Sequence, residues 1–302
     1  MKVAVLTPFR DEPADWLEVA AASVRTQVRP PNIAEIRHLM IFDGPESELP
    51  NWRAETEQVI CVGRRSNNVG QTPRLMGAQY AVDQWDSDIL FFLDADDAFE
   101  PTHVARLVLA ASASNAGLIM APTFRCTIEL ERYPAQGANY ILGPSKRHLG
   151  GAQIYISTSS SALNRPAFAV LPSLELPTDR LHTQHDWFFS WLCASRGVRL
   201  GWTSFPTYRY RIRRPGFYQD HGLPVPKDAQ REKTSRELED LRVWNAMPLE
   251  EKDRHIASIG ITDGLGTVSY QSVKSAIGAR VNDTVVATYD RLAGLKIQPF
   301  SK

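Results

Sequence analysis

The chain has 302 residues, of which 43% are hydrophobic and 23% charged, and its 34 lysines and arginines balance 34 aspartates and glutamates. This composition is ordinary for a folded globular protein and excludes a wholly disordered or fibrous chain. No stretch approaches the roughly 18 apolar residues of a membrane-spanning helix, and charge and proline follow the first apolar run too early for a signal peptide, so we expect a cytoplasmic protein.

The first half of the chain alternates short apolar runs with helical patterns. Buried strands are predicted for the apolar runs at 3–9, 38–44, 57–63 and 88–97. Helices are predicted between and after them, at 16–28, 72–85 and 101–114. Thr72 is expected to cap the second helix, with Pro73 at its first position. Strands that alternate with helices in this way are typical of a doubly wound α/β sheet.

From residue 117 the apolar runs become shorter. They predict added strands and loops that form a second layer on the same domain. Further along, the pattern predicts a helix at 185–197, two strands at 198–202 and 207–213, and a charged helix at 227–245. The remaining residues are expected to form further helices separated by proline and glycine.

The balanced net charge hides an uneven distribution. Residues 1–145 hold 12 Lys and Arg against 19 Asp and Glu, residues 146–214 hold 10 against 3, and residues 215–302 hold 12 against 12. The basic middle segment suits a phosphate-bearing ligand, although a solvated basic face explains the excess equally well.

Carboxylates end two of the predicted strands. Asp43 follows the second apolar run, and Asp94, Asp96 and Asp97 follow the fourth. In open parallel sheets the carboxyl ends of the strands form the ligand crevice. Three aspartates within four residues would repel one another unless a cation lay among them, and Mg²⁺ and Mn²⁺ prefer oxygen ligands of this kind. The alternative is that Asp96 or Asp97 caps the following helix.

Five short segments occur in an order that resembles a known family. They are TPFRDE (7–12), IFDG (41–44), NNVGQTPRLMGAQYA (67–81), FLDADD (92–97) and HDW (185–187). Together they resemble the family 2 glycosyltransferases, which have the GT-A fold of nucleotide-diphosphosugar transferases. The resemblance implies an α/β fold with a doubly wound mixed sheet. It also implies a catalytic domain of residues 1–214, with a nucleotide-sugar-binding half (1–115) and an acceptor half (116–214), and a helical C-terminal extension (215–302).

The resemblance further implies an inverting, metal-dependent transfer from a nucleotide-diphosphate sugar, with a UDP-sugar expected. Asp43 would accept the N3–H of a uracil, because an ionised carboxylate can only accept hydrogen bonds. Asp186 would be the catalytic base. Asp96 would bind Mn²⁺ or Mg²⁺ directly, with Asp94 near the ribose or a metal-bound water. The other donor-binding positions implied are Pro8, Phe9, Asp11, Glu12, Asn68, Arg74 and Ala95.

Two segments depart from the family pattern. Where the family often has Tyr-Arg-x-His, this chain has YRIR (210–213), and a cationic arginine cannot bind a metal. Either His221 replaces the missing histidine as a metal ligand, or Arg211 and Arg213 contact the diphosphate directly, which we favour. His185, beside the expected base, has no role that the sequence assigns.

The acceptor is the least determined part of the prediction. A hydroxyl on a saccharide, lipid or small molecule is expected. Residues 270–292 weakly resemble a helix-turn-helix, although a helical hairpin packed on the catalytic domain explains them better. If they bind nucleic acid, the acceptor would be a hydroxylated base in DNA, which would have to be flipped out of a duplex. A binding protein that keeps the fold without turnover is the third hypothesis.

Overall fold

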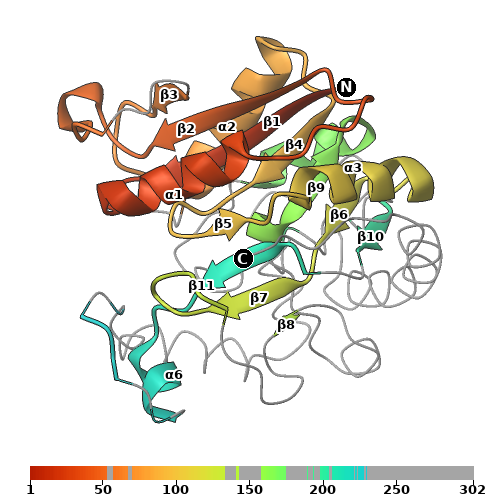
Figure 1. Cartoon of the computed structure of the whole chain (residues 1–302). Coiled ribbons are helices and arrows are strands. Elements are labelled where there is room, and N and C mark those ends of the chain that lie inside the picture. The colour runs from red at the N-terminus through yellow and green to blue at the C-terminus, as the bar shows by residue number, and fades with distance from the viewer. Residues whose placement is uncertain are drawn as a thin grey trace, which may run out of the picture.

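A seven-stranded mixed sheet organises the protein (Figure 1). This computed structural model describes residues 1–52, 57–66, 70–132, 141–142, 158–174, 189, 193, 198–203, 206–220, 222, 224–227 and 229. The strand order of the sheet is β10-β6-β9-β4-β1-β2-β3. These strands are β1 (Lys2–Phe9), β2 (Glu35–Phe42), β3 (Gln58–Cys61), β4 (Ile89–Phe92), β6 (Leu118–Met120), β9 (Ser161–Asn164) and β10 (Leu200–Trp202).

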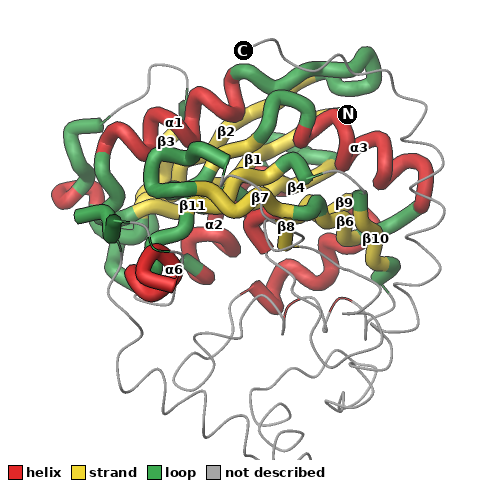
Figure 2. Tube along the Cα trace, turned by 60° about the horizontal axis from the view of Figure 1, so that its bottom comes forward, coloured by secondary structure: helices red, strands yellow, loops and turns green. Residues whose placement is uncertain are grey.

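The central strands of the sheet are buried on both faces, whereas the residues of β3 are only partly buried. Strands β3, β2, β1 and β4 run parallel, whereas β9 lies antiparallel to both β4 and β6. One face packs on α1 (Ala14–Arg25) and α3 (His103–Ser114), and the other on α2 (Gln71–Asp83) and the 3-10 segment η4 (Arg165–Leu174). Figure 2 shows the strands between these helices. Burial on both sides explains why the strands are continuous apolar runs without alternation.

A smaller sheet lies beside the carboxyl end of β4 and has the order β5-β11-β7-β8. Its strands are β5 (Ala98–Phe99), β7 (Thr123–Cys126), β8 (Ile141–Leu142) and β11 (Tyr208–Arg211). Because β5 follows the aspartates that end β4 and pairs with β11, this sheet brings residues near 210 next to those aspartates. The short helices η1 (Glu46–Glu48), η3 (Thr158–Ser160) and α6 (Pro215–Asp220) complete the described elements. The sequence predicts a second layer after residue 117, and β7, β8 and β11 form it, but β6, β9 and β10 also follow residue 117 and join the main sheet, so the prediction was only partly right.

The start of α2 differs from the prediction. The helix begins at Gln71, preceded by Gly70 with φ of 76°. Glycine adopts this left-handed conformation at no steric cost, and its carbonyl accepts the N–H of Arg74 at 3.0 Å. Thr72 and Pro73 therefore lie inside the first turn, and the prediction that Thr72 caps the helix was wrong.

Several predicted elements lie outside the described residues. Of the helix expected at 185–197, only Phe189 and Cys193 are described, and both are buried. The charged helix at 227–245 and the helical pair at 270–292 fall almost wholly or wholly beyond them. Within the described part of the chain, each helix is too short or too polar to cross a membrane.

His103, the first residue of α3, gives the protein a pH-dependent stability. The ring is fully buried, stacks on Phe99 with centroids 4.0 Å apart, and has Nδ1 2.8 Å from Oγ1 of Thr207. Burial lowers its pKa from 6.5 to about 3. Between these values the unfolded chain takes up a proton that the native protein does not, so the free energy of unfolding should fall by about 1.4 kcal/mol per pH unit as the pH drops below 6.5.

Urea unfolding of the wild type and of His103→Gln at several pH values between 6.5 and 4 checks this expectation. Glutamine retains a polar group for Thr207 but does not titrate, so the variant should lose part of the slope. The rest of the slope includes His38, whose pKa burial also lowers. Equal slopes in the two proteins would contradict the assignment.

Candidate functional site

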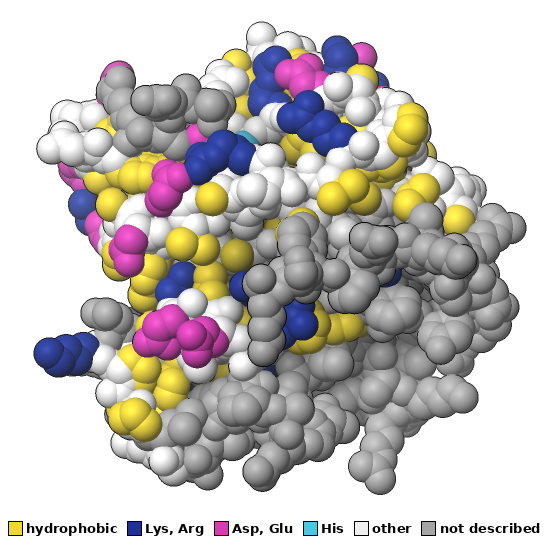
Figure 3. All heavy atoms as spheres, in the orientation of Figure 1, with side chains coloured by type: hydrophobic (Ala, Val, Ile, Leu, Met, Phe, Trp, Pro, Cys, Tyr) yellow, Lys and Arg dark blue, Asp and Glu magenta, His cyan; other side chains and the backbone are white. Residues whose placement is uncertain are grey.

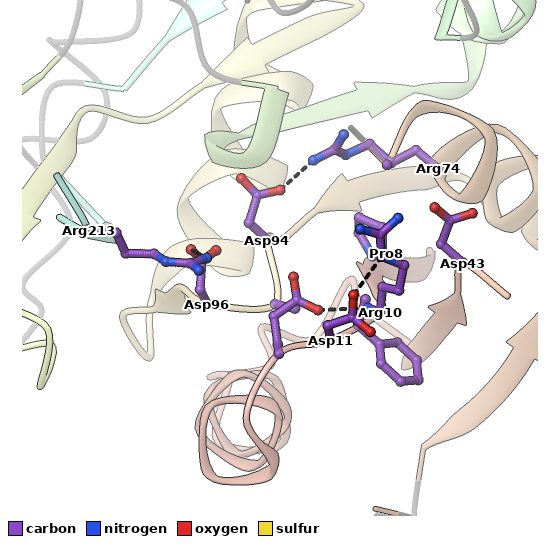
Figure 4. Close-up of a pocket in the computed structure, with 12 residues that line it drawn as sticks. Pro8, Arg10, Asp11, Asp43, Arg74, Asp94, Asp96 and Arg213 are labelled. Carbon is purple, nitrogen blue, oxygen red and sulfur yellow. Dashed lines mark hydrogen bonds and ion pairs between the residues drawn. The ribbon is translucent and has the colours of Figure 1, made fainter. Parts of the chain in front are cut away.

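A cleft of about 530 Å³ opens at the carboxyl ends of β1, β2 and β4 (Figure 4). Its walls come from the end of β1, the residues that follow these strands, the start of α2 and the segment after β11. This is the crevice that open α/β sheets use for ligands. The residues that line it are Pro8, Phe9, Arg10, Asp11, Glu12, Asp43, Gly70, Arg74, Asp94, Ala95, Asp96 and Arg213.

The structure gathers most of the predicted donor-site residues around this one cleft. Arg10 and Gly70 also line the cleft and were not predicted, although both lie within motifs that the sequence resemblance used. Asn68, Asp186 and His221 lie outside the described residues. Arg211 is described but does not line the cleft.

Two arginines pair with two aspartates on one wall of the cleft. Arg74 of α2 donates from Nη2 to Oδ1 of Asp94. Arg213, two residues after β11, donates from Nη1 to Oδ2 of Asp96 at 2.9 Å. Burial and the neighbouring charge of Asp94 raise the pKa of Asp96. Figure 4 shows these side chains pointing toward the cleft from different elements. The wall therefore offers both anionic oxygens and guanidinium donors to a ligand.

Asp97 lies behind this wall and has a structural role. It is 1% exposed. Its Oδ2 accepts the hydroxyl of Tyr208 at 2.5 Å, and its Oδ1 accepts the backbone N–H of Arg211 at 2.7 Å. Burial raises the pKa of Asp97 well above its usual range. Both oxygens are bonded to β11, so this carboxyl ties the end of β4 to the second sheet.

The alternative that Asp96 or Asp97 caps a helix is wrong. The next helix, α3, starts at His103, and Thr102 is the residue at its N-cap position. Asp96 turns toward Arg213 and Asp97 toward β11 instead, which explains the dense run of acidic residues without a capping role.

The donor set of this wall fits a divalent cation. Carboxylate oxygens of Asp94, Asp96 and Asp97 lie within 4.8 Å of one another, and within the described ranges they are the one such cluster of three. Each oxygen of Asp97 already accepts a hydrogen bond from β11, and this carboxyl lies behind the wall and does not line the cleft. Asp94 and Asp96 face the cleft, and Mg²⁺ is often held by one or two carboxylates together with substrate phosphates. Asp94 and Asp96 therefore suit a metal ion whose coordination shell a diphosphate would complete.

Arg211 occupies a different place from the one the sequence predicts. Its Nε donates to the carbonyl of Asp96 at 2.6 Å and its Nη1 to the carbonyl of Ile128. The guanidinium lies 4.2 Å from the ring centre of Trp16, which also packs against Arg213 at 5.0 Å. The buried side chain of Arg211 thus stabilises the backbone at Asp96 through a hydrogen bond. Arg213 is the arginine of this pair that lines the cleft. Trp16 was recognised only as an apolar residue of a helix.

The opposite end of the cleft carries Asp43. Its Oδ1 accepts two hydrogen bonds from Ser66, from the backbone N–H at 2.8 Å and from Oγ at 2.6 Å. Glu12 lies toward Asp96 and Arg213 instead; it accepts the backbone N–H of Arg10 at 2.7 Å, and burial raises its pKa. Phe9 lines the cleft and also packs on Phe42, with ring centres 5.4 Å apart. This end combines an apolar wall with a fixed carboxylate.

Charge is less segregated on the described surface than along the chain. On the face in Figure 3, acidic and basic side chains are interspersed instead of forming one acidic and one basic area. Two arginines of the basic middle segment (146–214) form ion pairs, Arg209 with Glu100 and Arg213 with Asp96. These arginines therefore neutralise acidic residues of the first half of the chain.

Comparisons with known proteins agree with this geometry. Residues 4–170 match the family model described as Glycosyl transferase family 2. The crystal structure of S. aureus TarS 1–349 in complex with UDP is similar at a TM-score of 0.51 and 11% identity, covering 99% of this chain and 93% of that chain. The complex of TarS 1–349 with UDP-GlcNAc gives 0.51 and 11%, covering 97% and 83%. At this identity the likeness concerns the fold alone.

A comparison with curated proteins gives no match. The family match, however, spans more than half of the chain and includes the strands whose ends form the cleft. The mixed sheet with its crevice of carboxylates is the GT-A architecture that the sequence predicted. The chain therefore belongs to the family 2 glycosyltransferases.

Proposed function

We propose that the protein is an inverting, metal-dependent glycosyltransferase that moves a sugar from a UDP-sugar to an acceptor hydroxyl. The observation that carries the proposal is the pairing of two unlike ends in one cleft. Asp43 offers a hydrogen-bond acceptor beside the apolar wall of Phe9, and the other end offers Asp96 and Arg213. A nucleoside diphosphate has a base and two phosphates to match these ends. The TarS complexes, which contain UDP and UDP-GlcNAc, support a uridine donor in this fold.

The leaving diphosphate requires positive charge as its bond to the sugar breaks. Asp94 and Asp96 are the residues that would hold a Mn²⁺ or Mg²⁺ ion, which would supply charge neutralisation at this point. Arg74 and Arg213 add guanidinium donors that can hydrogen bond phosphate oxygens bidentately. Preorganised charges of this kind stabilise a transition state because they need no rearrangement during the reaction.

The acceptor hydroxyl requires a base on the opposite side of the sugar. We propose Asp186 for this role on the resemblance of HDW (185–187) to the family motif. Its carboxylate would take the hydroxyl proton during attack, and no covalent enzyme intermediate is needed. The proposed acceptor is a saccharide, lipid or small molecule, bound by the acceptor half of a catalytic domain of residues 1–214. The extension of 215–302 is where a DNA acceptor would bind in the alternative.

Turnover with defined donors tests the function. The full chain is incubated with UDP-, GDP- and dTDP-sugars, with and without Mn²⁺, in the presence of saccharide, lipid and hydroxymethylated-DNA acceptors, and the released nucleotide and the product are measured. Transfer from a UDP-sugar that needs the metal supports the proposal. Transfer to DNA alone would support the alternative acceptor, and binding of UDP-sugar without any turnover would support a non-catalytic protein.

Asp186→Asn is expected to lower the rate of transfer at least about 10²-fold, because asparagine cannot accept the proton. Binding of UDP, measured by calorimetry, should remain within about twofold of the wild type, since the residue is assigned to the acceptor side. A variant that retains the wild-type rate would remove Asp186 from the proposal.

A further inference from the structure

We infer that Ser66 is a positioning residue that fixes the Asp43 carboxylate and makes the cleft select uracil over cytosine. This inference rests on the proposed function, because it concerns the base of the same nucleotide donor. It is carried by two hydrogen bonds from Ser66 to Oδ1 of Asp43 and by the loop geometry that delivers them.

The parallel pairing of β2 and β3 brings Ser66 to Asp43, although 23 residues separate them in sequence. The register ends at Phe42 opposite Cys61, and the pairing continues into the loops through the N–H of Val62, which donates to the carbonyl of Phe42 at 3.0 Å. The next N–H, of Gly63, donates to the carbonyl of Gly44 at 3.0 Å. The loops after the two strands are therefore joined where the strands end.

The loop after β3 then turns back over Asp43. Gly63 has φ of 85°, in the left-handed region that glycine adopts readily. Farther along, Arg65 donates from Nε to Oε2 of Glu48 at 2.7 Å. Both of these side chains are close to half exposed, so the ion pair contributes little stability. The turn at Gly63 and the bonds of Ser66 itself are the main determinants of this loop position.

Two donors on one oxygen orient the Asp43 carboxylate. An oxygen of an ionised carboxyl group has two lone pairs, and Ser66 provides a donor for each on Oδ1. The other oxygen, Oδ2, is then the one offered to a ligand in the cleft that Asp43 lines. Asp43 is only 6% exposed, so the orientation is fixed inside the protein and not left to water.

This orientation has a consequence for base selection. Uracil has an N–H at position 3, which an acceptor can bind, whereas cytosine has a lone pair there and an amino group next to it. A fixed carboxylate that faces position 3 leaves the cytosine nitrogen and the aspartate as two opposed acceptors, and such buried unpaired groups are costly. A carboxylate that could turn would reach the amino group of cytosine instead. Ser66 therefore contributes selectivity by preventing that turn.

The test measures the affinities of UDP and CDP for the full chain by calorimetry in the presence of Mn²⁺. In the wild type, UDP should bind about 100-fold more tightly than CDP. Ser66→Ala removes the hydroxyl donor and keeps the backbone donor. It should weaken UDP binding about tenfold. CDP binding should stay within about twofold, because the contact of the freed carboxylate with the cytosine amino group offsets the loss of a fixed orientation, so selectivity narrows about tenfold. Ser66→Thr restores a hydroxyl and should restore selectivity.

Arg65→Ala is the matched control, because it removes a side-chain contact of the same loop and leaves both hydrogen bonds of Ser66 to Asp43 in place, so the ratio of the UDP and CDP affinities should stay unchanged. If Ser66→Ala leaves the ratio of the UDP and CDP affinities unchanged, whether or not both affinities fall, the inference is overturned and the assignment of a UDP donor stands. If the wild type binds neither UDP nor CDP, the donor assignment fails and the inference fails with it.

Discussion

Asp96→Ala is expected to lower the rate of sugar transfer about 10³-fold and to abolish most of the affinity for Mn²⁺. Asp96 and Asp94 are the two carboxylates of the acidic cluster that face the cleft, so the substitution removes one of the two proposed protein ligands. It also releases Arg213 from its ion pair at 2.9 Å, leaving an unbalanced cation at the end of the cleft proposed for the diphosphate. Loss of a metal that stabilises transition-state charge costs several kcal/mol, which corresponds to this decrease in rate.

Two measurements check the expectation independently. Mn²⁺ binding without nucleotide is followed by electron paramagnetic resonance, and the transfer rate is measured at saturating donor. Asp83→Ala is the matched control, because Asp83 is an exposed carboxylate at the end of α2, away from the cleft. If Asp96→Ala and a chelator both leave the rate unchanged, Arg74 and Arg213 neutralise the diphosphate without a metal.

Asp97→Ala is expected to lower the free energy of unfolding by about 3 kcal/mol. The substitution leaves two buried donors without an acceptor, the hydroxyl of Tyr208 and the backbone N–H of Arg211. Each unsatisfied group costs about 1–3 kcal/mol, and removal of a carboxyl whose burial raises its pKa offsets part of that sum. Urea unfolding at neutral pH, followed by circular dichroism, measures the difference.

Milder substitutions separate the structural role of Asp97 from metal binding. Tyr208→Phe removes a single donor and should cost about 1 kcal/mol. Asp97→Asn retains a carbonyl acceptor, so its loss in the free energy of unfolding should lie between those of Tyr208→Phe and Asp97→Ala. Its affinity for Mn²⁺ should stay within about twofold of the wild type. A large loss of Mn²⁺ affinity in a folded Asp97→Asn protein would make Asp97 a ligand, contrary to the geometry of its two bonds.

The sequence was sufficient for the parts of the fold that depend on local pattern. Apolar runs identified β1, β2, β3 and β4, and the run is longest in the buried strands, because parallel strands covered on both faces carry no alternation. The residues that end these strands identified the cleft, since parallel strands present their carboxyl ends at one edge. The start of α2 could not be read in the same way, because Gly70 and Thr72 are both acceptable N-terminal residues and only the backbone conformation distinguishes them.

The different positions of neighbouring arginines and aspartates depend on tertiary contacts, which the sequence does not show. Arg211 and Arg213 are two residues apart, so a continuous strand would point both in one direction. Strand β11 ends at Arg211, however, and Arg213 lies beyond it and turns to Asp96. Likewise, nothing local distinguishes Asp97 from Asp96, because their different partners come from residues more than 100 positions later.

The position of α6 links the cleft to the later part of the chain. This helix begins at Pro215, two residues after Arg213, and the hydroxyl of Tyr218 donates to the carbonyl of Ile212 at 2.7 Å. The bond holds α6 against the segment that carries Arg213, so a backbone shift of this segment on donor binding would be transmitted to the helix. Gln219 is exposed on α6. A fluorescent label attached there would turn the helix into a reporter of donor occupancy, read without any knowledge of the acceptor.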